Sequence, residues 1–329
     1  MKNFKYNSER ISSTIKNGSI QATVFGCVVI LFYIAEHFGS QTNITFHSLF
    51  YMLNLAIFLI LLYFNKSKPA FYILCTTISY TAINALKNNI GENYITSTAY
   101  QNVCIFLAAN LLLFSCLPNT RLRAKRNLGL LILIFGQYSI GEHLSRQDLS
   151  LNLLSLPDSA LSGLALILFA LTLLILFTKM TIRGNLSDYS FFFSTCCIAL
   201  GLRHSDSASG LSLFFSSSSL LMLYSLSFSL YFETYKDMLT GFYSRNSYLI
   251  QTKKFPLKYS IGLISIDDYD KLERNFGRRA KNNIVKLIAR QISEQEKEEP
   301  IFRYTEDEFI ILFRNADKKE TFQRMEEIR

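Results

Sequence analysis

Three consecutive carboxylates, Glu306, Asp307 and Glu308, lie between two short apolar runs near the end of the chain. The runs, residues 301–302 and 309–313, are separated by a tight polar segment, which predicts a β-hairpin with the carboxylates at its tip. Carboxylate oxygens are hard ligands, so such a tip could hold Mg²⁺ against the phosphates of a nucleotide. The same pattern is also typical of an ordinary solvated turn, and the residues upstream bear on the choice.

Three segments resemble the signatures of one protein family. Residues 303–309, RYTEDEF, resemble the R-Y-G-G-D/E-E-F signature of GGDEF domains, the diguanylate cyclase family. Residues 237–245, DMLTGFYSR, are similar to the family's opening D-x-L-T-G-L-x-N-R, and residues 264–277 are similar to its D-x-D-x-F-K-x-I-N-D-x-x-G segment. Because the three segments occur in the family's order, the C-terminal part of the chain is identified as a member of this family.

The resemblance implies positions for a metal ion, Mg²⁺ or Mn²⁺. Family members hold the metal with the first Asp of D-x-D and with the D/E residue of the signature, and these positions are Ser265 and Asp307 here. Glu308 would act beside Asp307 in catalysis. Phosphoryl transfer needs several charged oxygens around the metal, whereas Ser265 brings only a hydroxyl. Asp267, expected on the same strand and face, is a displaced substitute.

The resemblance also implies positions that bind GTP. The guanine-recognising Asn and Asp of the family fall at Glu273 and Asn282, and a phosphate-contacting Lys falls at Asp270. Thr305 and Glu306 replace the Gly-Gly pair, whose bare backbone lets the nucleotide approach closely. Because a β-branched side chain and a negative charge both oppose triphosphate binding, the sequence predicts a degenerate nucleotide site.

Two further departures from the family pattern concern regulation and completeness. The R-x-x-D motif that binds the cyclic di-GMP product aligns with Glu296 and Glu299, and two carboxylates cannot replace a guanine-binding arginine. The closing portion of the family's domain has no counterpart after residue 329. We therefore expect a domain that is incomplete at its C-terminus, either as a fragment or by natural truncation.

The part of the chain before about residue 232 is much more apolar than the rest. Half of the 329 residues are hydrophobic, and they are concentrated there. Apolar runs of about 20 residues predict transmembrane helices. We expect a multi-span α-helical membrane domain over residues 1–232 with about eight spans. These spans are 20–38, 48–64, 70–86, 101–117, 128–140, 160–178, 189–202 and 210–232.

The distribution of charge predicts the orientation of these spans. With the N-terminus in the cytoplasm, the inner segments hold twelve Lys and Arg residues and the outer loops hold three. This asymmetry obeys the positive-inside rule and predicts that both termini of a multi-pass protein are cytoplasmic. The family resemblance implies that the membrane is the bacterial inner membrane. The net charge of +9 lies mostly in this half, because residues 233–329 carry 19 Lys and Arg against 17 Asp and Glu. Topology and anionic lipids explain the excess, so no nucleic-acid partner is expected.

The four histidines are all expected at or beyond the outer membrane face; they are His37, His47, His143 and His204. Clustered imidazoles with neighbouring carboxylates could bind a transition metal or report external pH. The alternative is that histidine is simply tolerated in a polar interface. The six cysteines lie in or beside apolar spans without zinc-type spacing, and are interpreted as buried apolar residues.

Residues 233–329 alternate between strand and helix patterns. They predict a helix over 246–252, a strand over 259–266, a helical stretch broken at Gly277, the hairpin and a helix from Lys318. This order resembles the first part of the α+β palm-like fold that GGDEF domains share with nucleotidyl cyclases. From Leu211 the last span runs into Asp237 without Pro or Gly, so a continuous helix could pass a movement to this domain.

Three functions remain open at this point. We expect a membrane-anchored signalling protein of the cyclic di-GMP type whose degenerate GGDEF domain is non-catalytic and binds GTP or a partner, such as another GGDEF protein or a second copy as a dimer. The alternative is an active diguanylate cyclase that condenses two GTP molecules under control of a membrane sensor domain. The third is a decayed gene whose membrane half alone functions. Ser265, Thr305 and Glu306 all count against catalysis.

Overall fold

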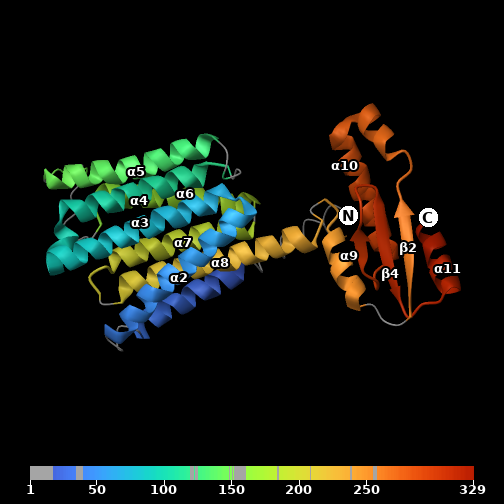
Figure 1. Cartoon of the computed structure of the whole chain (residues 1–329), viewed down its shortest axis with the longest axis horizontal. Helices are drawn as coiled ribbons and strands as arrows, with labels where there is room; N and C mark the ends of the chain where they lie inside the picture. Colours follow the sequence, from blue (N-terminus) through green and yellow to red (C-terminus); the bar gives the residue numbers. More distant parts are fainter. Residues whose placement is uncertain are drawn as a thin grey trace. The chain divides into compact units, whose positions relative to one another are not determined.

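The computed structural model describes residues 18–34, 40–118, 122, 125–147, 149, 151, 161–183, 185–207, 209–237, 239–254 and 258–329 (Figure 1). The chain divides into two compact units, residues 1–226 and 227–329. This division and the predicted boundary at residue 232 both fall within one helix, α8 (Gly210–Tyr235).

The first unit is a bundle of long helices. In the part of the chain that the structure describes, each of the eight predicted spans coincides with a helix. A helix over Gly18–Ile34 is followed by α2 (Ser40–Phe64), α3 (Ser67–Ile90), α4 (Thr98–Cys116), α5 (Lys125–Arg146), α6 (Gly163–Arg183), α7 (Leu186–Arg203) and α8, and the 3₁₀-helix η1 (Gly91–Thr96) joins α3 to α4.

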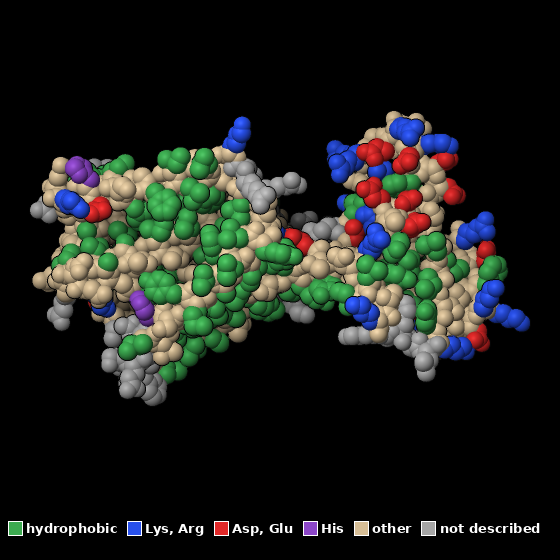
Figure 2. Space-filling view, in the orientation of Figure 1, with side chains coloured by type: hydrophobic (Ala, Val, Ile, Leu, Met, Phe, Trp, Pro, Cys, Tyr) green, Lys and Arg blue, Asp and Glu red, His purple; other side chains and the backbone are tan. Residues whose placement is uncertain are grey.

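Four of the described helices are long and apolar enough to cross a membrane. They comprise Ile44–Phe64, Thr98–Cys116, Gly163–Ile182 and Gly210–Tyr235, and the shorter helix Gly18–Ile34 is also apolar. Figure 2 shows hydrophobic side chains over much of the visible face of this unit, as expected of a surface that meets lipid. The helical class of this unit is confirmed, while its eight crossings stay a prediction.

Polar side chains join helices of the bundle that are far apart in sequence. The Ser219 hydroxyl of α8 donates to Asn54 Oδ1 of α2 at 2.7 Å, and Asn54 Nδ2 donates to Thr77 of α3 at 3.1 Å. The hydroxyls of Ser216 and Ser218 donate to carbonyls of their own helix. The serine run of the last predicted span therefore makes the backbone hydrogen bonds expected of it, and Ser219 adds a link between helices.

The second unit is an α+β domain around a four-stranded sheet. The strands lie in the order β1 (Tyr243–Ser244), β3 (Ile301–Arg303), β4 (Glu308–Arg314) and β2 (Tyr259–Ser265). β4 pairs antiparallel with both β2 and β3, whereas β1 pairs parallel with β3. The helices are α9 (Arg245–Gln251), α10 (Tyr269–Gln295) and α11 (Lys318–Ile328), with the 3₁₀-helix η2 (Thr252–Lys254) after α9.

Alternation along β4 distributes its apolar side chains to the two faces of the sheet. Phe309, Ile311 and Phe313 pack in one cluster with Val285 of α10 and with Met325 of α11. Ile310 and Leu312 point to the opposite face. There they form a second cluster with Phe302 of β3 and Tyr248 of α9. The sheet is thus covered by α10 and α11 on one face and by α9 on the other.

The hairpin, the break in α10 and the last helix are confirmed. Gly277 has a φ of +77°, a left-handed conformation that interrupts α10 as predicted and that favours glycine. The strand prediction is one residue too long, because β2 ends at Ser265. Asp267 therefore lies in the turn before α10, so the expectation that it shares a strand face with Ser265 is wrong. The short strand β1 was not predicted.

Candidate functional site

An ion pair between Asp237 and Arg303 joins the first and last of the three motifs. Arg303 Nη1 donates to the two Asp237 oxygens at 3.0 and 3.2 Å, and the same carboxylate accepts from the Thr240 amide and hydroxyl. Burial alone would raise the pKa of Asp237, but the hydrogen bonds from Thr240 and the charge of Arg303 lower it below its ordinary value. Arg303 also donates to the Glu306 carbonyl at 2.7 Å, which fixes the backbone of the hairpin tip.

A pocket of about 440 Å³ opens beside this ion pair. We call it the hairpin pocket, because the tip of the β3–β4 hairpin forms one wall. Three residues singled out in the sequence line it, namely Asn282, Thr305 and Glu306. The other lining residues are Asp237, Leu239, Ser244, Arg245, Tyr269, Arg278, Lys281 and Arg303. With four basic and two acidic side chains in its lining, the pocket suits an anionic ligand.

The side chains at the hairpin tip bond to one another. The Thr305 hydroxyl lies 2.8 Å from Asp307 Oδ1 and 3.1 Å from Glu308 Oε2, and it accepts a hydrogen bond from the Glu308 amide. A Gly-Gly pair could not make these contacts, because it has no side chains. The hydroxyl has one proton, so Thr305 donates to one or the other of the two carboxylates that the resemblance assigns to metal and catalysis.

The positions expected to bind metal do not form a closed coordination site. Ser265 is opposite Glu308 in the β2–β4 register, and the Ile266 amide donates to the Asp307 carbonyl. Among the described residues, no group of three or more His, Cys, Asp or Glu side chains could hold a metal ion. Asp307 and Glu308 fit a metal held jointly with the phosphates of a ligand, which is how proteins commonly hold Mg²⁺.

The positions expected to recognise guanine lie on the two halves of α10. Glu273 precedes the break at Gly277, and Asn282 follows it. The Glu273 carboxylate accepts a hydrogen bond from Lys281, and this bond with the nearby positive charges lowers the pKa of Glu273 below its ordinary value. The carboxylate expected to face guanine is thus paired with a lysine of the protein.

Lys281 is a site residue that sequence reasoning missed. Its side chain is buried, although most lysines are exposed, and it aligns with Val285, Ala289 and Ile292 on the buried face of the second half of α10. Phe276 and Leu287, two apolar residues of the same helix, are by contrast exposed. A lysine four residues before a core valine was the available signal, because residues at that spacing share a helix face.

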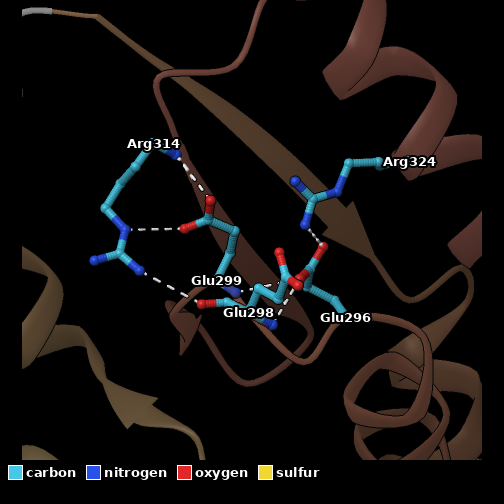
Figure 3. Close-up of polar contacts among 5 residues, drawn as sticks. All are labelled: Glu296, Glu298, Glu299, Arg314 and Arg324. Carbon is cyan, nitrogen blue, oxygen red and sulfur yellow. Dashed lines mark hydrogen bonds and ion pairs between the residues drawn. The ribbon is translucent and has the colours of Figure 1, made fainter.

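The position of the product-binding motif holds acidic side chains that pair inside the domain (Figure 3). Glu296 is buried, accepts from Arg324 Nη2 at 2.6 Å, and accepts from the amides of Glu298 and Glu299. The Glu299 carboxylate accepts from the Arg314 amide and from Arg314 Nε at 3.0 Å. These carboxylates stabilise the segment between α10 and β3, and they offer no positive charge to a product.

The described histidines have different surroundings. His47 Nδ1 lies 2.9 Å from the Tyr80 hydroxyl, His143 pairs with Gln147, and His204 packs on Phe32. His37 lies outside the described residues, so a shared sensing site stays a prediction. Burial of the cysteines is confirmed only in part. All six are free; Cys75, Cys104 and Cys197 are buried, Cys196 is half-buried, and Cys27 and Cys116 are exposed.

Comparison with known proteins bears on the second unit above all. The family model "Diguanylate cyclase, GGDEF domain" matches residues 234–329. No curated protein sequence matches the chain. Among solved structures, Vibrio cholerae LapD S helix-GGDEF-EAL, bound to c-di-GMP, is 20% identical with a TM-score of 0.29 over 31% of this chain and 26% of that one.

Two further solved structures are similar at the same level. A diguanylate cyclase/phosphodiesterase from Caldicellulosiruptor saccharolyticus is 19% identical with a TM-score of 0.27, over 30% of this chain and 64% of that one. The diguanylate cyclase SiaD of Pseudomonas aeruginosa, in complex with its activator SiaC, is 16% identical with a TM-score of 0.29, over 62% of this chain and 70% of that one. The chain thus spans less than two thirds of the first two. Residues 234–329 thus match the GGDEF family model and carry the family's three motifs in order.

Proposed function

We propose that this protein is a membrane-anchored signalling protein of the cyclic di-GMP type, whose GGDEF domain binds GTP or a partner without making cyclic di-GMP. The family match supports the signalling class. The four apolar helices of the first unit support the anchor, and the charge asymmetry of the loops supports cytoplasmic termini.

One observation carries the non-catalytic part of the proposal, namely the bonding of Thr305 at the hairpin tip. Its hydroxyl lies within hydrogen-bond distance of both Asp307 and Glu308 and donates its one proton to either, so a metal held by both carboxylates would have to displace it. The remaining expected ligand, Ser265, is neutral and adds no negative charge to hold a metal ion against a bound triphosphate. Catalysis would therefore have to proceed with a weakened metal site.

The alternative function is an active diguanylate cyclase. The adjacent Asp307 and Glu308 carboxylates favour it, because they remain partly exposed at the rim of the domain, where a nucleotide-bound metal could reach them. In this case Asp307 and Glu308 would hold the metal with the triphosphate. Mg²⁺ or Mn²⁺ would neutralise charge on the phosphates and favour attack by the 3′ oxygen.

The experiment uses membranes that contain the full chain, labelled GTP and either Mg²⁺ or Mn²⁺. We expect no cyclic di-GMP from the wild-type protein, while a restored variant, Ser265→Asp with Thr305→Gly and Glu306→Gly, provides a gain-of-function comparison. Product from the wild type that disappears in Asp307→Ala would overturn the proposal and establish the cyclase. Thermal unfolding of each variant verifies that the domain is folded.

A further inference from the structure

Basic side chains from three elements meet in the hairpin pocket. They are Arg245 at the start of α9, Arg278 and Lys281 in α10, and Arg303 in β3. Arg303 is already engaged by Asp237 and by the Glu306 carbonyl. Arg245, Arg278 and Lys281 therefore supply the positive charge that a ligand would meet.

Lys281 has the most restricted environment of these three. Its side chain is only 7% exposed, and its ammonium contacts Glu273, lies 3.7 Å from Glu306 Oε2 and sits 4.5 Å from the centre of the Tyr269 ring. The hydrogen bond to Glu273 and the nearby carboxylates raise the pKa of Lys281 above its ordinary value, so it is charged at neutral pH. A charged ammonium in the lining of a pocket can pair with an anionic ligand when one of its two carboxylate partners moves away.

The two carboxylates hold Lys281 unequally. Glu273 makes the closer contact and belongs to the same helix, whereas the Glu306 side chain is 78% exposed and only approaches at 3.7 Å. An exposed ion pair of this length contributes little free energy. Arg303 holds the backbone carbonyl of Glu306. The side chain of Glu306 can therefore turn out to solvent while the hairpin backbone stays in place.

We propose that Lys281, with Arg278 and Arg245 beside it, binds the phosphate chain of a nucleoside polyphosphate, and that Glu306 occupies the same ammonium when no ligand is present. This inference rests on the proposed function, because it concerns the pocket through which the domain would bind GTP. It makes Glu306 an internal competitor of the ligand. It also assigns phosphate binding to Arg245, Arg278 and Lys281, whereas the family resemblance placed a phosphate contact at Asp270, which carries no positive charge.

The neighbouring contacts fit this arrangement. The Arg245 guanidinium lies 4.9 Å from the centre of the Tyr304 ring, a stacking contact that leaves its edge N–H groups able to donate. Asn282 lines the same pocket and offers amide donors. A phosphate chain between α9 and α10 would thus meet donors from both helices.

The test measures binding of GTP and of inorganic tripolyphosphate to the full chain in detergent. Replacing a competing anion with a neutral isostere should strengthen binding, so Glu306→Gln is expected to tighten both ligands about fivefold to tenfold. Lys281→Met is expected to weaken both at least about tenfold, and Lys281→Arg to retain part of the affinity. In the Lys281→Met background, the gain from Glu306→Gln should disappear, because the two residues act on one contact.

Matched controls separate this contact from general charge effects. Lys286→Met removes an exposed lysine from the same helix, and Glu320→Gln removes an exposed carboxylate from α11. Neither is expected to change binding by more than about twofold at moderate ionic strength. If Lys281→Met does not fold, Glu306→Gln and Lys281→Arg decide the question by themselves.

Two results would overturn the inference, and neither coincides with failure of the proposed function. If the affinity for GTP and tripolyphosphate is the same in Glu306→Gln, Lys281→Arg and the wild type, the phosphates bind elsewhere. If neither the wild type nor Glu306→Gln binds GTP or tripolyphosphate, the pocket does not bind a nucleoside polyphosphate. The domain would then act by binding a partner. Failure of the proposed function appears instead as cyclic di-GMP made by the wild type.

Discussion

Arg324 Nη2 donates a hydrogen bond to the buried carboxylate of Glu296 at 2.6 Å, and this contact ties α11 to the end of α10. The partners are 28 residues apart in sequence. Glu296 also accepts from two backbone amides, so its charge is well satisfied. A position that the family resemblance relates to product binding is thus used here for stability.

Arg324→Ala should destabilise the second unit by about 2–3 kcal/mol, because it leaves a buried carboxylate without its counter-charge. Chemical denaturation of the full chain, with protease cleavage of the C-terminal unit as the readout, measures this change in the free energy of unfolding. Arg329→Ala is the matched control, since Arg329 makes an exposed contact with Glu326 at 3.5 Å. That control should lose no more than about 0.5 kcal/mol, and equal losses from both variants would contradict the structural role of Arg324.

Asp237→Asn should destabilise the same unit by about 1–3 kcal/mol at neutral pH, since Arg303 loses its charged partner. The pKa of Asp237 is lowered on folding, so its contribution is complete above its ordinary value of 3.8 and is lost as the pH falls through the folded-state pKa. The difference between wild type and variant should therefore stay constant from about pH 5 to 8 and shrink below about pH 4. Melting temperatures of the wild type and Asp237→Asn across this pH range test the prediction. If their difference grows on acidification, the pKa of Asp237 is not lowered on folding.

Gly277→Ala should destabilise the domain by about 1 kcal/mol, because a Cβ is disfavoured at a φ of +77° even with open space around it. It should also weaken GTP binding, since the break in α10 sets Lys281 against Glu273. Asn283→Ala, at an exposed position in regular helix, should by contrast be neutral or slightly stabilising. If Gly277→Ala raises the melting temperature, the break is not a required feature.

The termini are expected on the cytoplasmic side of the inner membrane. A fluorescent protein fused after residue 329 should be bright, and alkaline phosphatase fused at the same place should be inactive, because each reporter works on only one side. Weakening the charge asymmetry by replacing Arg121, Arg123, Lys125 and Arg126 with Ser should reduce the bright fraction. A periplasmic C-terminus would mean an odd number of crossings.

The sequence by itself determined the local elements, because each is encoded by neighbours along the chain. Apolar runs of the right length gave the helices of the first unit, and two apolar runs around a polar turn gave the β3–β4 hairpin. Gly277 marked the break in α10, since glycine readily adopts a left-handed conformation. The three ordered motifs also gave the family, which the match over residues 234–329 bears out.

Tertiary structure alone decided which of these residues meet. The sequence showed Asp237 and Arg303 in separate motifs, but their ion pair depends on parallel pairing of β1 with β3 across some 60 residues. It showed Lys281 as one lysine among many, whereas its burial depends on which face of α10 the sheet covers. Apolar side chains of α10 such as Phe276 and Leu287 stay exposed, while Val285 and Ile292 pack with Phe309, Ile311 and Phe313. Long-range packing, which no local pattern encodes, thus turned a surface-type residue into the centre of the hairpin pocket.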